Sequence, residues 1–394
     1  MVKGAAPDDD NTLGLLMFCQ GLEEQCIAMP NQTMMCKVLR ILALDFQRMG
    51  QLEEALSAAG EAVALLRDLV PDQPGVPNLD LARSLHHLSN CLSDLGHWEE
   101  ALEAVRESVA HHCDLARDWP NVFNPDLALS LNTLSNRLSD LGHREEALDA
   151  VRECVALCRD LARDRPSAFN PDLASSLNTL SNRLSDLGHQ EEALEVVQEC
   201  VVHYRDLARD RPNVFTPDLS LSLNTLSGCL SNLTHQEEAL AAVRESVALY
   251  RDLAQDRPNA FNPDLARSLN TLSNCLSRLS HRERALEAVR ESVALYRDLA
   301  RDWPSVFNPG VASSLKNLST CLSDLSNREE ALKAMQESVA LRRNLARDRP
   351  NVFTPNLADS LNNLSDCLSE LGHRQEALEA MQESVAIRPD LARN

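Results

Sequence analysis

Apolar residues recur along this chain at alternating steps of four and three. Between residues 127 and 141, five leucines follow this pattern: Leu127, Leu131, Leu134, Leu138 and Leu141. This spacing places them on one side of an α-helix. A second apolar stripe follows Gly142 and ends before Pro166, because proline cannot continue a helix. The pattern predicts two helices of roughly 17 and 20 residues joined by a short turn.

Residues with special backbone preferences mark the expected helix ends. Asn124 is a candidate N-cap, since its side-chain oxygen can accept from free backbone N–H groups of the first turn. Pro125 follows at the position where the missing N–H costs nothing, and Thr216 and Thr354 can replace Asn in other copies. Gly142 is expected to end the first helix, because it accepts a positive φ.

The whole pattern repeats with a period of 46 residues. Ser130–His143 and Ser176–His189 are identical, and an alanine keeps the same step in eight copies from Ala55 to Ala377. A single helical hairpin cannot bury both of its apolar faces, whereas stacked copies can. We therefore predict an all-α solenoid of about eight antiparallel hairpins over residues 31–394. Residues 1–30 do not fit the period and are expected to form an acidic start and an N-terminal capping helix.

The residues at these steps resemble the tetratricopeptide repeat. They are the large–small–large pattern of the first helix, the turn glycine and the small residue of the second helix: Leu131, Leu134, Ser135, Leu138, Gly142, Ala147 and Val155. The small residues allow two helices to approach to about 8–10 Å. The long repeat is similar to the arrays of kinesin light chains and of bacterial and fungal signalling proteins. This resemblance implies a right-handed superhelix whose first helices line a concave groove.

Some positions depart from the family pattern. Thr234, Ser280 and Ser326 stand where the turn glycine is expected, so these turns are predicted to be strained, by about 1 kcal/mol each, or differently shaped. Pro389 predicts an early end to the last helix, with no polar capping helix after it. We expect the last apolar face to be covered by a partner, a second copy or a further domain.

Two columns of asparagine follow the polar side of the first helices. Asparagine is a mediocre helix former, and its carboxamide offers both a donor and an acceptor. One hypothesis is a peptide-binding ladder in the groove; the other is hydrogen bonding between adjacent hairpins or plain solvent exposure. The candidate groove residues are Asn90, Asn132, Asn136, Asn178, Asn182, Asn224, Asn270, Asn274, Lys316 and Asn362. The family's basic carboxylate clamp is not matched, although Arg83 and Arg267 also occupy first-helix positions.

No catalytic or metal-binding pattern stands out. A histidine column at the inter-helix turn, which includes His143, has neighbours about 10 Å away, too far for shared metal ligation. Glu145 and Glu146 suit the positive end of the second helix. Trp119 and Trp303 are interpreted as packing residues, with a contact surface as the alternative. We predict no enzyme, no metal and no cofactor, because nothing in the repeat changes to create a unique site.

Charge and cysteine usage narrow the partners. The net charge of −21 disfavours nucleic acid and anionic lipid. The twelve cysteines lack zinc-type spacing and are interpreted as reduced, which favours the cytoplasm. No segment reaches the roughly 20 apolar residues of a membrane span. The expected function is a protein or peptide interaction scaffold; the alternatives are a regulatory arm of a larger nucleotide-binding signalling receptor and a self-assembling array that stacks through its last repeat.

Overall fold

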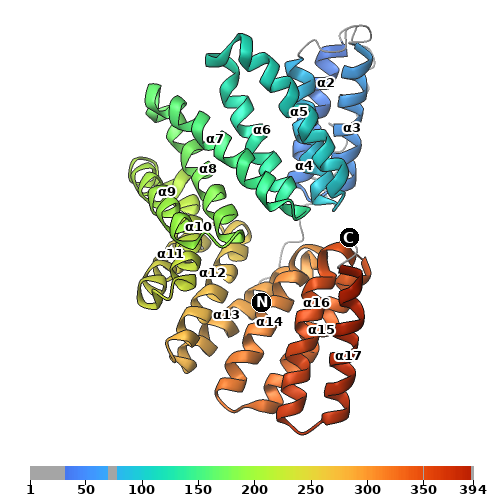
Figure 1. The fold of residues 1–394 in the computed structure, drawn as a ribbon, viewed down its shortest axis with the longest axis vertical. Coiled ribbons are helices and arrows are strands. Elements are labelled where there is room, and N and C mark those ends of the chain that lie inside the picture. Colours follow the sequence, from blue (N-terminus) through green and yellow to red (C-terminus); the bar gives the residue numbers. More distant parts are fainter. Residues whose placement is uncertain (1–31, 70–77, 349, 392–394) are drawn as a thin grey trace, which may run out of the picture. The chain divides into compact units, whose positions relative to one another are not determined.

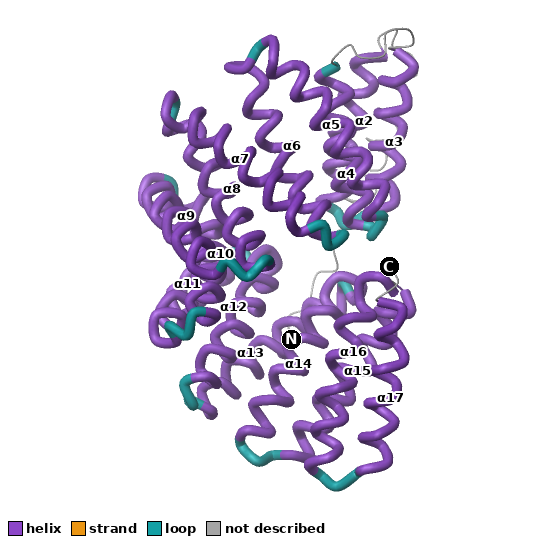
Figure 2. The backbone as a smooth tube through the Cα atoms, viewed as in Figure 1, coloured by secondary structure: helices purple, strands orange, loops and turns teal. Residues whose placement is uncertain are grey.

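The computed structural model describes residues 32–69, 78–348 and 350–391. These ranges contain sixteen helices and no strand, and short turns join the helices (Figure 2). The chain divides into two compact units at the Phe169–Asn170 bond, near the start of α8. The prediction of an all-α solenoid is confirmed, and residues 1–30, predicted as a capping segment, lie outside the described residues.

The described residues of the first unit form six helices and the beginning of a seventh, drawn in order in Figure 1. The helices that lie within it are α2 (Gln32–Arg48), α3 (Leu52–Leu69), α4 (Leu79–Asp94), α5 (Trp98–Asp118), α6 (Pro120–Asp140) and α7 (Arg144–Asp164). Each packs against the next one along the chain, and α2 also contacts α4, as α4 contacts α6. First helices of neighbouring hairpins are therefore closer together than second helices.

The second unit continues the same alternation. Its helices are α8 (Pro166–Asp186), α9 (Gln190–Asp210), α10 (Pro212–Asn232), α11 (Gln236–Asp256), α12 (Pro258–Arg278), α13 (Arg282–Asp302), α14 (Pro304–Asp324), α15 (Arg328–Asp348), α16 (Pro350–Glu370) and α17 (Arg374–Leu391). Again the first helices contact one another, α10 with α12 and α12 with α14. No described helix is long and apolar enough to cross a membrane.

The first helices begin earlier than the sequence predicted. α6 starts at Pro120 and holds Pro125 in its interior, so Asn124 is a helical residue and not an N-cap. The same correction applies to Thr216 in α10 and Thr354 in α16. A proline this close to the helix start removes only one backbone hydrogen bond. Asn78, the equivalent of Asn124 before α4, does cap its helix, by accepting from the Leu81 backbone N–H at 3.0 Å.

An aromatic anchor accounts for the added turn. The guanidinium of Arg211, which directly precedes α10, lies 4.7 Å from the centre of the Phe215 ring, and Arg257 lies 4.8 Å from that of Phe261. Both rings are buried. The ring and its cation hold the starts of α10 and α12 in place, which outweighs the local capping preference of the residue before the second proline.

The turn between the two helices of a hairpin is as predicted. Gly142 has φ +80°, and the His143 N–H donates to the Leu138 carbonyl at 2.9 Å. Ser280 adopts φ +63° and keeps the corresponding bond, from His281 to Leu276, also at 2.9 Å. The turns without glycine therefore keep the same shape and place a non-glycine residue in the left-handed region, where a side chain is disfavoured.

Small residues at the helix contacts form a buried polar seam. Ala101 and Ala147 are fully buried, and Ser89 Oγ donates to the Ala101 carbonyl at 2.8 Å inside its hairpin. In the opposite direction, Ser108 Oγ on α5 donates to the Ala82 carbonyl on α4 at 2.7 Å. In the α6–α7 hairpin a cysteine takes this role, with Cys154 Sγ 3.1 Å from the Ala128 carbonyl. Each seam fixes how closely and in which register the two helices pack.

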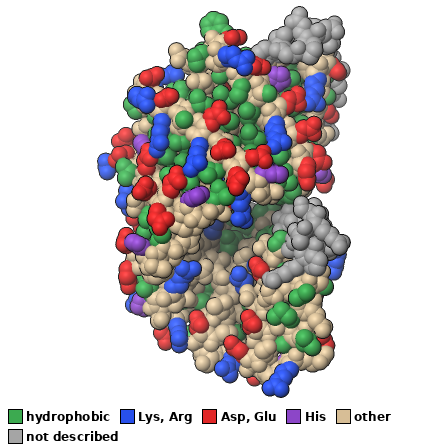
Figure 3. Space-filling model, in the orientation of Figure 1, with side chains coloured by type: hydrophobic (Ala, Val, Ile, Leu, Met, Phe, Trp, Pro, Cys, Tyr) green, Lys and Arg blue, Asp and Glu red, His purple; other side chains and the backbone are tan. Residues whose placement is uncertain are grey.

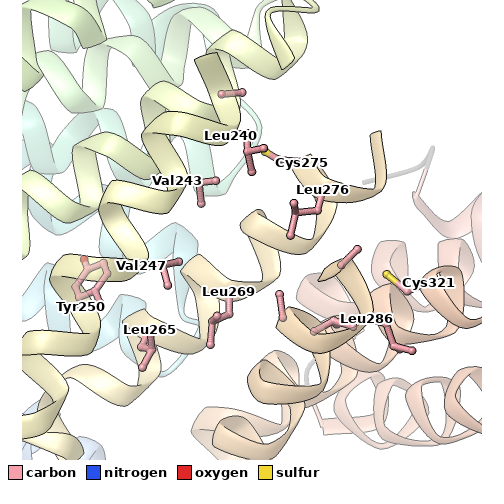
Figure 4. Close-up of a cluster of buried hydrophobic side chains, with 14 of the residues drawn as sticks. Leu240, Val243, Val247, Tyr250, Leu265, Leu269, Cys275, Leu276, Leu286 and Cys321 are labelled. Carbon is pink, nitrogen blue, oxygen red and sulfur yellow. The ribbon is translucent and has the colours of Figure 1, made fainter. Parts of the chain in front are cut away.

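The apolar core runs between consecutive hairpins. Figure 4 shows Val243, Val247 and Tyr250 along α11, facing Leu265 and Leu269 of α12. All five are almost completely buried. The described cysteines are free thiols, and burial raises the pKa of thiols such as Cys91, to about 11. At the last helix the prediction was wrong, because α17 runs through Pro389 to Leu391.

Candidate functional site

The first asparagine column is half-buried and partly used inside the array. Asn224 Nδ2 donates to Ser268 Oγ at 2.6 Å, and Asn270 Nδ2 donates to Ser314 Oγ at 2.7 Å. Each bond links a first helix to the first helix of the next hairpin. Hydrogen bonding between adjacent hairpins therefore occurs for the amide nitrogens of these two residues.

The oxygens of this column behave differently from its nitrogens. The Oδ1 atoms of Asn132, Asn178 and Asn224 are shielded from solvent and have no hydrogen-bond partner. A shielded acceptor without a donor costs about 1–3 kcal/mol. The three residues are otherwise only half-buried, so an incoming N–H donor can reach a carboxamide that turns toward it. This repeated unpaired acceptor is the strongest chemical feature of the first helices.

The second column is more exposed and less regular. Asn182 and Asn274 are exposed, while Asn90 and Asn136 are half-buried. The column is interrupted by Gly228, and Thr320 and Asp366 continue it in the last two hairpins. The remaining candidates, Lys316 and Asn362, belong to the first column and are half-buried.

The two arginines near the columns are tied to carboxylates. Arg83 forms a two-pronged ion pair with Asp126, with Nε–Oδ1 at 3.1 Å and Nη2–Oδ2 at 3.2 Å. Arg267 is bonded to Asp264 on its own helix. Paired in this way, neither guanidinium is available as a clamp for a free carboxylate, in agreement with the unmatched clamp in the sequence.

A histidine cluster in the first unit was not anticipated. His86, which takes the asparagine position in α4, and His112 on α5 are 8% and 2% exposed. His112 Nδ1 lies 2.8 Å from Ser130 Oγ, but His112 Nε2 and His86 Nδ1 have no partner. Burial lowers the pKa of both imidazoles to about 4. The sequence does contain a signal for this cluster. His86 replaces asparagine in the first column, and His112 stands at the repeat position that is Cys158, Tyr204, Tyr250 and Tyr296 in later hairpins.

The turn histidines are solvated, as predicted. His143 and His235 are exposed, and each approaches the glutamate three residues later, with His235 Nδ1 at 3.2 Å from Glu238 Oε1. No cluster of His, Cys, Asp or Glu able to hold a metal ion occurs in the described part of the chain.

The interpretation of two tryptophans as packing residues was wrong: Trp119 is 64% and Trp303 51% exposed.

This geometry defines the class of protein: stacked helical hairpins with a 46-residue repeat, small residues at the helix contacts and a polar first-helix face. The tetratricopeptide repeat family matches residues 127–163, 173–207, 311–349 and 357–388. The chain therefore contains tetratricopeptide repeats in these four ranges. Residues 28–73, 78–118, 219–258 and 264–302 also match the family described as anaphase-promoting complex subunit 5. None of the curated protein sequences is significantly similar to the chain.

Solved structures with the same fold share little sequence with this chain. A Rap protein complexed with competence and sporulation factor has 12% identity and a TM-score of 0.61, covering 95% of this chain and 92% of that one. BtubC from P. vanneervenii has 18% identity and a TM-score of 0.51 over 63% of this chain and 92% of its own. A Pyrococcus horikoshii signal transduction ATPase with a tetratricopeptide repeat sensor has 12% identity and a TM-score of 0.57 over 92% of this chain and 48% of its own.

Proposed function

We propose that the chain is a non-catalytic scaffold that binds an extended segment of a partner protein along its first helices. The observation that carries this proposal is the repeated occurrence of an unpaired Oδ1 acceptor, at Asn132, Asn178 and Asn224. An extended peptide presents backbone N–H groups that can satisfy such acceptors. The fold supports the proposal, since the similar Rap structure is a complex with competence and sporulation factor.

The test uses a library of 12-residue peptides displayed on phage, selected against the intact chain. The dissociation constant of an enriched peptide is then measured for the wild type and for Asn132→Ala/Asn178→Ala/Asn224→Ala. Loss of three peptide-facing carboxamides should weaken binding roughly tenfold or more, at about 0.5–1.5 kcal/mol per hydrogen bond. Circular dichroism checks that the variant stays helical.

A matched control separates the columns from asparagine content in general. Asn121, Asn213 and Asn259 are exposed near the starts of α6, α10 and α12, so Asn121→Ala/Asn213→Ala/Asn259→Ala should leave the affinity unchanged. Equal affinities of both triple variants would show that the column residues only connect hairpins. Failure to enrich any peptide would remove the extended-segment proposal itself.

A regulatory arm of a larger receptor is the second candidate. It is favoured by the fold match to the signal transduction ATPase with a tetratricopeptide repeat sensor, because 92% of this chain aligns with only 48% of that protein. Sequencing of full-length transcripts tests it directly. A continuous reading frame with a nucleotide-binding domain would establish this role, and its absence from all transcripts would exclude it.

Self-association is favoured by the surface of α17. Leu378 and Val385 are 52% and 56% exposed there, whereas their counterparts Leu148 and Val155 on α7 are 5% and 3% exposed. Stacking of another copy on this stripe would bury it. Light scattering should then show a mass that rises with concentration for the wild type and stays constant for Leu378→Glu; a constant monomer mass in both would rule the stacking out.

A further inference from the structure

The turn between α12 and α13 reverses the charge that every other turn carries. The charge of each turn is taken from four residues: the last residue of the first helix and the first three residues of the second. At each of the other seven turns the acidic residues outnumber the basic ones. In the α12–α13 turn the four residues are Arg278, Arg282, Glu283 and Arg284. Three arginines face a single glutamate in a chain whose net charge is −21.

All four of these side chains are exposed, so the reversal lies at the surface. Arg278 Nη1 donates to the backbone carbonyl of Ser231 at 3.0 Å, which holds it against the turn of the preceding hairpin. Arg282 and Arg284 form no ion pair within the described ranges. On the face drawn in Figure 3, by contrast, acidic and basic side chains are interspersed.

The reversal also breaks an ion-pair ladder between second helices. Arg106 on α5 pairs with Glu146 on α7 at 3.2 Å, and Arg290 on α13 pairs with Glu330 on α15 at 3.9 Å. At the equivalent junction, the residue forty positions after Arg244 of α11 is Arg284 instead of a glutamate. Like charges in this arrangement repel each other, so the unliganded protein is destabilised here.

The turn histidine loses its partner at the same place. His235 and His373 each lie within 3.2 Å of the glutamate three residues later. For His281 that residue is Arg284. A positive group thus replaces a negative one at this position.

We propose that Arg244, Arg278 and Arg284 form a docking site for an acidic segment of a partner protein. Arginine binds carboxylates through two parallel N–H···O bonds. The site spans one hairpin, about 10 Å, which corresponds to about three residues of extended peptide. The acidic turns on both sides would repel a longer polyanion, which favours a short run of Asp or Glu over nucleic acid. This site lies at the turns and is independent of the asparagine columns.

The test is fluorescence anisotropy with a labelled hexaglutamate peptide at low ionic strength, using the intact chain. The wild type is expected to bind, and its affinity should fall as salt screens the charges. Arg278→Asp/Arg284→Glu gives this turn the charges of its neighbours and provides Arg244 with a glutamate, so the variant should fold. Its affinity for hexaglutamate should be roughly tenfold or more lower.

A variant with the same change of net charge provides the control. Arg117→Asp/Arg163→Glu replaces two exposed arginines at the ends of α5 and α7, each of which is paired only with an aspartate one turn earlier. This variant should retain the wild-type affinity. Equal loss in both variants would show that net charge alone governs binding, and an unaffected Arg278→Asp/Arg284→Glu variant would overturn the proposed site. A labelled hexaglutamine peptide should not bind to any of the proteins.

Discussion

The two units bury different titratable groups at one position of the repeat. His112 on α5 and Tyr250 on α11 are separated by three repeats, and both are 2% exposed. The imidazole Nδ1 lies 2.8 Å from Ser130 Oγ, whereas the tyrosine hydroxyl donates to the Pro217 carbonyl at 3.1 Å. The same repeat position therefore accepts either side chain, because each fills the space and has one polar atom bonded. The helices are the same in both units, but the stability of each unit should respond differently to acid and to truncation of this side chain.

Truncation of the aromatic ring should have the largest effect. Tyr250→Ala leaves a cavity between α11 and α12 and an unpaired Pro217 carbonyl, so local stability should fall by about 3–5 kcal/mol. The effect of His112→Ala should be smaller, about 1–3 kcal/mol, because a smaller ring is removed. Hydrogen exchange measured on peptides from residues 212–279 and 79–140 reports each unit separately. Equal losses in the two variants would contradict the comparison.

Acid should act on the two units in opposite directions. His86 and His112 have a folded-state pKa of about 4 against 6.5 in the unfolded chain. As pH falls below 6.5 the unfolded chain takes up protons first, so stability present above pH 6.5 is lost between pH 6.5 and 4. At about 1.4 kcal/mol per pKa unit, the loss is on the order of 3 kcal/mol for each imidazole taken alone.

The second unit contains groups of the opposite kind. Burial raises the pKa of Asp218 and Asp264 above 3.8. The folded unit then binds protons before the unfolded chain does, so these carboxyls favour folding as pH falls toward their folded pKa. Hydrogen exchange at pH 7 and pH 4.5 should show new opening in residues 79–140 but not in 212–279. His112→Gln should reduce the acid sensitivity of the first unit; parallel opening of both units would contradict the pKa assignment.

Substitutions in the inter-helix turns should have the smallest effect on stability. Ser280→Gly should stabilise the α12–α13 turn by about 1 kcal/mol, because glycine accepts the φ of +63° without a Cβ contact. The reciprocal change Gly142→Ser should cost a similar amount. The melting temperatures should shift by about 2 °C in opposite directions. Shifts of the same sign in both variants would indicate that the two turns differ in shape.

Periodic features of this protein could be predicted from the sequence with little ambiguity. The leucine stripe from Leu127 to Leu141 indicated the first helix, and the repeated Ala147 position indicated where two helices pack closely. These predictions succeeded because eight copies state the same pattern, so local exceptions do not obscure it. The start of α6 was missed, since Asn124 and Pro125 are good capping residues in isolation, whereas in the structure the helix extends back to Pro120.

The candidate site was less predictable. The asparagine columns could be identified in the sequence, but the pairing of Asn224 with Ser268 depends on two hairpins lying side by side. The charge reversal of one turn by Arg278 and Arg284 was present in the sequence but was not singled out there. The structure adds that Arg278 is bonded to the Ser231 carbonyl of the preceding hairpin.

The sequence by itself determined the helical class, the 46-residue hairpin, the turn geometry and the acidic surface, since each follows from residue spacing within one repeat. Only the tertiary structure decided which polar atoms are satisfied and which histidines are buried and neutral. The physical reason is that these properties belong to junctions between hairpins. At a junction, residues about forty to forty-eight positions apart meet, as Arg106 meets Glu146 and Ser227 meets Cys275, and desolvation there decides their charge and bonding.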